Sequence, residues 1–120
     1  MINTDWVNMT PHDIVIVNEE GTPLTIVKST GTIRLVSETR PMVQFVRSMP
    51  VVPPPKFHEL DGSVKEFFKA PRVIVSGIVG EWCTKNDIRK EVYGPSTHPN
   101  HTMRDAQGRI VGIMALQKYC

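Results

Sequence analysis

Short runs of β-branched residues alternate with turn residues in the first third of the chain. Residues 13–17, 24–28 and 32–37 each have the alternating or continuous apolar pattern of a β-strand. The segments between them, 18–21 and 29–31, contain glycine, which readily adopts the positive φ of tight turns. This pattern predicts three strands joined by short turns, as in an antiparallel meander.

Proline interrupts the middle of the chain. Residues 42–46 could form a strand, whereas the prolines within 50–55 prevent continuous pairing in a sheet because proline lacks the backbone donor. The proline triplet at 53–55 favours the polyproline conformation. We expect a stiff surface connection there, with a docking motif for a partner protein as the alternative. Residues 57–69 suit either an irregular loop or a short helix.

The second half predicts one helix between further strands. Residues 72–75 form an apolar strand pattern, and we expect a single short helix near 77–89 with Ser76 as its cap. Residues 91–93 suit a brief extended segment, followed by a polar loop at 94–101. One face of the expected helix carries Ile78, Val79 and Trp82.

A turn signal near the C-terminal end predicts a hairpin. Asp105 opens the segment Asp-Ala-Gln-Gly and Gly108 closes it, between the expected strand segments 102–104 and 109–114. Aspartate and glycine at those places are typical of a tight turn between two strands.

Composition supports sheet rather than helix. The chain has 15 valines, 10 isoleucines and 10 threonines among 120 residues, but only 4 leucines and 3 alanines. Side chains branched at Cβ pack well on a pleated sheet and lose rotamer freedom in a helix. We therefore expect a mainly β (α+β) fold: an antiparallel meander, a small barrel-like sheet or a sandwich-like sheet, with one helix. Residues 1–120 are expected to be a single domain with a proline-rich connection near 50–55.

Charge and hydropathy exclude several classes of protein. Fourteen basic against twelve acidic residues give a net charge of +2, without the basic excess typical of nucleic-acid binding. No apolar run approaches the roughly 20 residues of a membrane helix. The first residues show no basic region followed by an apolar stretch, so we expect no secretion signal there. We expect a cytoplasmic protein whose two cysteines, Cys83 and Cys120, are reduced thiols.

Catalytic and metal-binding patterns are weak. The chain lacks the serine-hydrolase elbow, the phosphate-binding loop and the dinucleotide-binding glycine pattern. Cys83 could pair with a histidine as a nucleophile, but a small buried thiol is the preferred interpretation. His98 and His101 are separated by Pro99 and Asn100 in a loop, so we predict no metal site, no cofactor and no catalysis. Other scattered candidate metal ligands are His12, His58, Asp105 and Cys120.

The polar segment from Tyr93 to Asp105 is the best candidate for ligand binding. Its aromatic ring, hydroxyls, imidazoles and guanidinium suit an anionic ligand that carries a planar base. The alternative is a purely structural loop, in which Arg104 pairs with Asp105 and Tyr93 packs beneath. The candidate ligand residues are Tyr93, Ser96, Thr97, His98, His101 and Arg104 in this segment and Arg109 just after it, and Thr102 offers a further hydroxyl.

Three segments resemble a family of small proteins encoded by bacteriophages and prophages. The segment 8–12, Asn-Met-Thr-Pro-His, resembles the Asn-Leu-Thr-Pro-His opening of that family, with methionine in place of leucine. The segment 104–112 is similar to its Arg-Asp-x-x-Gly-x-Ile-x-Gly motif, and 72–76 resembles the strand and serine before its helix. This chain has a longer, proline-rich middle. The resemblance implies a phage origin and a β-rich fold.

The resemblance also draws attention to His12 and Arg104. Thr10 and His12 are candidate ligand residues, although Pro11 could simply fix the entry into the first strand while Thr10 and His12 bond to nearby backbone. We expect a non-catalytic, homo-oligomeric binding protein that sequesters a small anionic ligand, such as a cyclic nucleotide used as a host immune signal. The alternatives are a protein-interaction or virion-associated module and, less favoured, an enzyme that cleaves such a signal.

Overall fold

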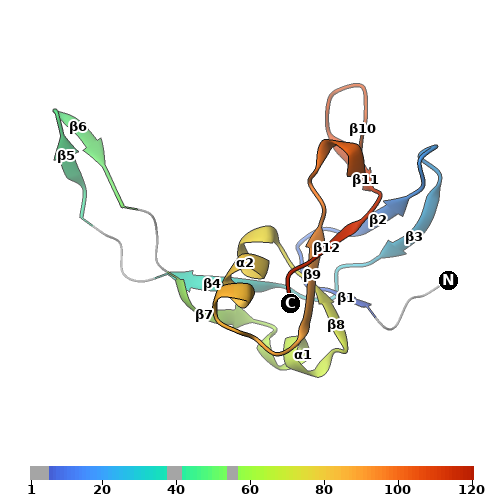
Figure 1. The fold of residues 1–120 in the computed structure, drawn as a ribbon, viewed down its shortest axis with the longest axis horizontal. Coiled ribbons are helices and arrows are strands. Elements are labelled where there is room, and N and C mark those ends of the chain that lie inside the picture. The colour runs from blue at the N-terminus through green and yellow to red at the C-terminus, as the bar shows by residue number, and fades with distance from the viewer. Residues whose placement is uncertain (1–5, 38–41, 54–56) are drawn as a thin grey trace.

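The computed structural model describes residues 6–37, 42–53 and 57–120, which form a mainly β fold with short helices (Figure 1). The mainly β class predicted from composition is confirmed. The strands are divided among two four-stranded sheets and two two-stranded ribbons in this part of the chain, and they do not close into a barrel.

One four-stranded sheet has the order β1-β8-β9-β12. β1, β8 and β9 run parallel, and β12 is antiparallel to β9. The strand predicted at 72–75 is confirmed as β8, and it is buried on both faces, as is typical of a central parallel strand. Val73 and Val75 point into one core cluster and Ile74 into another. The four strands are β1 (Trp6–Asn8), β8 (Arg72–Ile74), β9 (Glu91–Pro95) and β12 (Leu116–Lys118).

The second four-stranded sheet has the order β10-β11-β2-β3. β2 and β3 form an antiparallel hairpin whose turn contains Gly21 at φ 82°, and β11 lies parallel to β2. The hairpin predicted around Asp105 and Gly108 is confirmed as β10–β11, with Gly108 at φ 80°. The four strands are β2 (Ile14–Val17), β3 (Pro23–Val27), β10 (Thr102–Arg104) and β11 (Ile110–Ile113).

The predicted three-strand meander is wrong. The third strand, β4 (Ile33–Ser37), pairs with β7 (Phe57–Gly62) and not with β3. Two hydrogen bonds redirect the chain after β3: Thr30 N–H donates to the carbonyl of Asn8 (3.0 Å), and Ile33 N–H donates to the carbonyl of Met9 (3.2 Å). The chain therefore continues along the end of β1 instead of turning back along β3.

Two helices accompany the sheets in the described part of the chain. α1 (Val64–Lys69) follows β7, and α2 (Gly77–Lys85) ends at Lys85, earlier than the predicted limit of residue 89. The segment 99–101 forms a short 3-10 helix, η1 (Pro99–His101). No helix among the described residues is sufficiently long and apolar to traverse a bilayer.

The face that α2 buries differs in part from the predicted one. Val79 and Cys83 are buried, whereas Ile78 is 53% exposed. Ser76 precedes the helix as expected, but its side chain makes no capping hydrogen bond with the described part of the chain. Val79 and Cys83 belong to a core cluster against which Tyr119 packs, and the Tyr119 ring lies so close to Gly80 that a Cβ at that position would be 2.4 Å from a ring carbon.

The same ring also contacts the neighbouring sheet. A Cβ at Gly94 in β9 would lie 2.8 Å from a carbon of the Tyr119 ring. Tyr119 N–H donates to the carbonyl of Val92 (2.8 Å), and the Thr84 hydroxyl donates to the carbonyl of Tyr119 (2.9 Å). The residue after β12 thus joins α2 to β9, and only glycine leaves room for the ring at both contacts.

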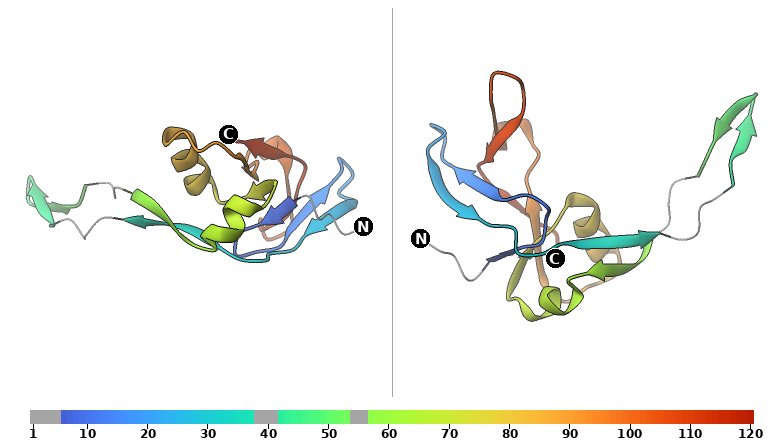
Figure 2. Two further views of the ribbon diagram at one scale, coloured as in Figure 1. Left: turned by 90° about the horizontal axis from the view of Figure 1, so that it is seen from below. Right: turned by 180° about the vertical axis from the view of Figure 1, so that it is seen from behind.

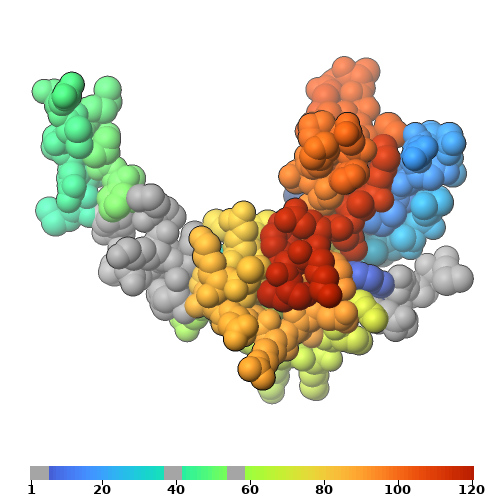
Figure 3. Space-filling model, in the orientation of Figure 1, coloured from blue at the N-terminus to red at the C-terminus, as the bar shows by residue number. Residues whose placement is uncertain are grey.

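A hairpin of β5 (Gln44–Val46) and β6 (Met49–Val51) stands away from the other elements (Figures 1, 2 and 3). The strand expected at 42–46 is confirmed. The two-residue turn places Arg47 at φ 49° and Ser48 at φ 68°, the signs required for the turn type that matches strand twist. Of the predicted proline-rich connection, Pro54 and Pro55 lie outside the described residues.

Replacing Gly62 with alanine should destabilise the fold more than replacing Gly108. Both glycines have positive φ, but a Cβ at Gly62 would lie 2.4 Å from the carbonyl oxygen of Thr32, whereas Gly108 faces open space. We expect Gly108→Ala to lower the free energy of unfolding by about 1 kcal/mol, and Gly62→Ala by roughly 3 kcal/mol. Urea unfolding of both variants measures the difference, and equal losses would contradict the close contact.

Candidate functional site

The motif at 8–12 forms a buried hydrogen-bond network. The Asn8 side chain is fully buried, and its Nδ2 donates to the carbonyl oxygens of His12 (2.8 Å) and Val27 (2.9 Å). Its Oδ1 accepts from Thr10 N–H (2.9 Å). The Thr10 hydroxyl lies 2.6 Å from Asn8 Oδ1 and 2.9 Å from the carbonyl oxygen of His12. Thr10 and the His12 backbone therefore hold strand ends together, while His12 itself is exposed.

The loop after β9 gathers a serine and two histidines. Ser96 Oγ lies 2.8 Å from His101 Nδ1, and the ring centroids of His98 and His101 are 5.3 Å apart. The short helix η1 brings these side chains together, because it places His98 and His101 one turn apart. Ser96 is buried, whereas Thr97 and both histidines are exposed. The structure thus brings part of the predicted site into one cluster.

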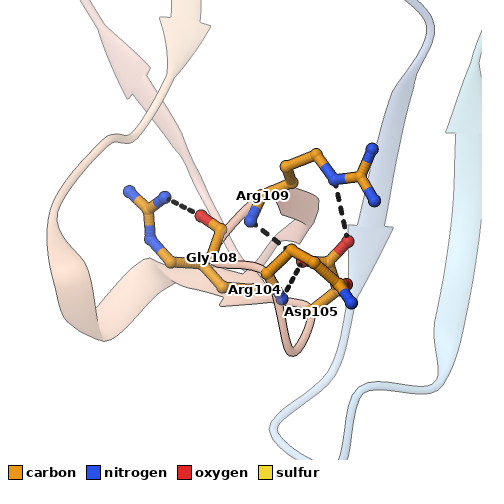
Figure 4. Close-up of polar contacts among 5 residues, drawn as sticks. Arg104, Asp105, Gly108 and Arg109 are labelled. Atoms are coloured by element: carbon orange, nitrogen blue, oxygen red, sulfur yellow. Dashed lines mark hydrogen bonds and ion pairs between the residues drawn. The ribbon is translucent and has the colours of Figure 1, made fainter.

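The two predicted arginines make separate contacts in the turn of the β10–β11 hairpin (Figure 4). Arg104 Nη1 donates to the carbonyl of Gly108 (2.6 Å). Asp105 pairs with Arg109, with 3.3 Å between Oδ2 and Nε, and not with Arg104 as the structural alternative had it. Asp105 Oδ1 also accepts from the backbone N–H of Gln107 (2.9 Å) and Arg109 (3.0 Å). Figure 4 shows the two guanidinium groups pointing to different sides of the turn.

Tyr93 of β9 packs against Trp6 of β1, across the intervening strand β8. Its ring meets the Trp6 ring edge-on with centroids 4.8 Å apart, and its hydroxyl lies 3.3 Å from Glu91 Oε1. Glu91 also pairs with Arg72, with 3.2 Å between Oε2 and Nε, and the Arg72 guanidinium lies 5.8 Å from the centre of the Trp6 ring. These contacts fix the side chain of Tyr93 against the side chains of Trp6 and Glu91.

The structure also shows a pocket that sequence reasoning missed. Its volume is about 540 Å³, within the range of small-molecule sites, and it lies between the end of α2, the start of β9 and the end of β12. Its walls include the cationic residues Arg89, Lys90 and Lys118 and the acidic residues Asp87 and Glu91. The three cations lie in two segments far apart in the sequence, so they gave no local motif.

The charges around this pocket favour an anion. Three cationic and two acidic side chains border it, and one acid, Glu91, is already paired with Arg72. Lys90 Nζ donates to the carbonyl of Ala70, and burial lowers the pKa of Lys90 while Glu91 partly opposes that shift. Arg89 and Lys118 are exposed to solvent and could turn toward a ligand.

Cys83 is poorly suited to act as a nucleophile in this fold. Its side chain is fully buried, and burial, together with the nearby Cys120, raises the pKa of the Cys83 thiol to about 11. The thiolate is the reactive form, so this group is protonated at neutral pH. Within residues 6–37, 42–53 and 57–120, no group of three or more histidine, cysteine or acidic side chains could hold a metal ion.

No protein-family model, curated protein or solved structure matches this chain. The resemblance to a phage family therefore stays a prediction, and the proposals below start from the geometry of the described residues.

Replacing Asn8 should lower the free energy of unfolding far more than replacing His12. Asn8→Ala removes the donor to the buried carbonyl of Val27 and leaves the Thr10 hydroxyl as the side-chain donor to the carbonyl of His12, which should lower the free energy of unfolding by roughly 2–4 kcal/mol. His12→Ala removes an exposed side chain and should cost at most about 0.5 kcal/mol. Thermal and urea unfolding measure both values; a large loss in His12→Ala would show that its imidazole, too, supports the fold.

The two cysteines should differ in their reaction with a thiol reagent. Cys83 is fully buried with a raised pKa, whereas Cys120 is partly exposed. We expect iodoacetamide at neutral pH to label Cys120 in the folded protein, and Cys83 only after denaturation. Mass spectrometry of the peptides reads both sites, with Cys83→Ala as the control. Rapid labelling of Cys83 in the folded chain would contradict its burial.

Proposed function

We propose that this chain is a non-catalytic binding protein that sequesters a small anionic, nucleotide-derived ligand in the pocket beside the end of α2. The observation that carries the proposal is the pocket of about 540 Å³ bordered by Arg89, Lys90 and Lys118. Phosphate groups are bound well by arginine, which offers two donors at once, and by lysine as a point charge.

The distribution of charge favours a small molecule over a nucleic-acid strand. The cations border one open pocket and do not form a basic stripe, and the net charge of the chain is only +2. Ile88 contributes apolar surface beside the charged groups, as a ligand with both a base and phosphates requires. The mechanism is mass action: the ligand is held out of solution and released unchanged.

A biological setting follows from the sequence resemblance. A phage-encoded protein in the host cytoplasm that removes a nucleotide immune signal would need only affinity and abundance, and a chain of 120 residues is inexpensive to produce in quantity. This setting is part of the proposal and gives the ligands to test first: cyclic mono-, di- and oligonucleotides.

Binding experiments can distinguish the pocket from the histidine loop. The double variant Arg89→Ala/Lys118→Ala should bind the ligand at least tenfold more weakly, since each charged hydrogen bond contributes about 1.5–3 kcal/mol. His98→Ala/His101→Ala should bind normally. Lys28→Ala/Lys65→Ala removes the same net charge at exposed positions outside the pocket lining and controls for long-range attraction. Isothermal titration calorimetry measures all four proteins.

The possible outcomes lead to different conclusions about the site and the function. No binding across the panel overturns the proposal, and loss of binding only in the histidine variant moves the site to the loop predicted from the sequence. Heating the complex should release the ligand unchanged. A cleaved ligand would instead identify the chain as an enzyme.

A protein-interaction or virion-associated module is the second candidate. The observation that favours it is the exposed β5–β6 hairpin, whose side chains at 44–46 and 49–51 are all exposed. Co-purification from infected cells would separate this role from ligand binding, because a virion component should remain with assembled particles.

A further inference from the structure

The β5–β6 hairpin with its flanking residues, 42–53, is called the arm below. Phe45 is 72% exposed and Met42 is 85% exposed. Two-stranded hairpins are marginally stable alone in water, and exposed apolar groups of this extent mark interaction sites. The large apolar side chains exposed on the arm are Met42, Val43, Phe45, Val46, Met49, Val51 and Val52.

A second exposed apolar surface lies on β3. Among the described residues this strand lies at the edge of its sheet, so its outer backbone groups before Val27, whose carbonyl accepts from Asn8 Nδ2, can pair with another strand. Leu24 is 64% exposed and Ile26 is 49% exposed, and as alternate residues they lie on the same face. An edge strand with exposed apolar side chains is a ready template for a further strand.

The charges of these two surfaces are complementary. The arm has one charged residue, Arg47, in its turn, and no acidic residue. The turn between β2 and β3 carries two exposed acidic residues, Glu19 and Glu20. An arm that lies along β3 can therefore place Arg47 near that acidic turn.

We propose that a second copy of this chain covers the arm, with the arm of each chain lying along β3 of the other. In Figures 1 and 2 the arm and the β2–β3 hairpin lie toward opposite ends of the molecule. Two chains laid antiparallel can therefore form both contacts at once, which gives a closed dimer with two equal interfaces. This inference does not depend on the proposed ligand.

The first experiment compares oligomeric states. Size-exclusion chromatography with light scattering should give twice the mass of one chain for the natural sequence, and one chain for Phe45→Asp and for Leu24→Asp. Ile78→Asp is the matched control, because Ile78 is similarly exposed on α2 and the change should leave the dimer intact. Circular dichroism verifies folding, and Phe45→Ser replaces Phe45→Asp if the latter unfolds.

Mixing the two monomeric variants tests the arrangement itself. In a mixed pair, one contact carries both substitutions, while the other joins a natural arm to a natural β3. The mixture should therefore form a dimer, weaker than the natural one, although neither variant does so alone. Native mass spectrometry distinguishes the mixed pair by mass.

A charge exchange tests the register. Arg47→Glu should weaken the dimer, and adding Glu19→Arg/Glu20→Arg in the same chain should restore it. A natural protein that stays monomeric up to millimolar concentration, or a dimer that survives both Phe45→Asp and Leu24→Asp, overturns the proposal. A mixture that stays monomeric also overturns it, since the arm would then have another occupant.

Discussion

A fully buried asparagine amide holds the junction from which the other elements extend. The Asn8 side-chain amide donates to the backbone carbonyl of Val27 in β3 and to that of His12, just before β2. The backbone carbonyl of Asn8 accepts from Thr30 N–H. A buried amide without partners is costly, so the strands must meet in this one geometry. Among the described residues, no buried side-chain nitrogen or oxygen lacks a partner. The paths of β3 and β4, and hence both sheets, depend on this junction.

The local sequence pattern was sufficient to predict most of the elements, but not to predict which strands pair with one another. Alternation and turn chemistry predicted β2, β3, β4, β8 and the β10–β11 hairpin, because those signals lie within a few residues of each other. The partner of β4 depended instead on bonds from Thr30 and Ile33 to the end of β1, more than twenty residues earlier. The exposure of Ile78 likewise depended on which face of α2 meets the distant strands of the core, where Val79 and Cys83 are buried. Contacts of this kind leave no periodic signal.

The predicted site shows the same difference between features that depend on neighbouring residues and features that depend on the folded backbone. Residue types alone could identify Ser96, His98 and His101 as a group because they are neighbours in one loop. They could not show that Arg104 and Arg109 bond to opposite parts of the turn, since this depends on its backbone geometry. The cations of the pocket come together only when the end of β12 meets the segment after α2.

The Tyr119 ring beside Gly80 and Gly94 has a mechanical consequence for the pocket. Tyr119 borders that pocket and also bridges helix and sheet. If a bound molecule held the Tyr119 ring against both glycines, occupancy of the pocket and rigidity of the helix–sheet contact would be thermodynamically linked, and each would stabilise the other to the same extent. Amide hydrogen exchange in α2 would then report remotely on a molecule bound beside it.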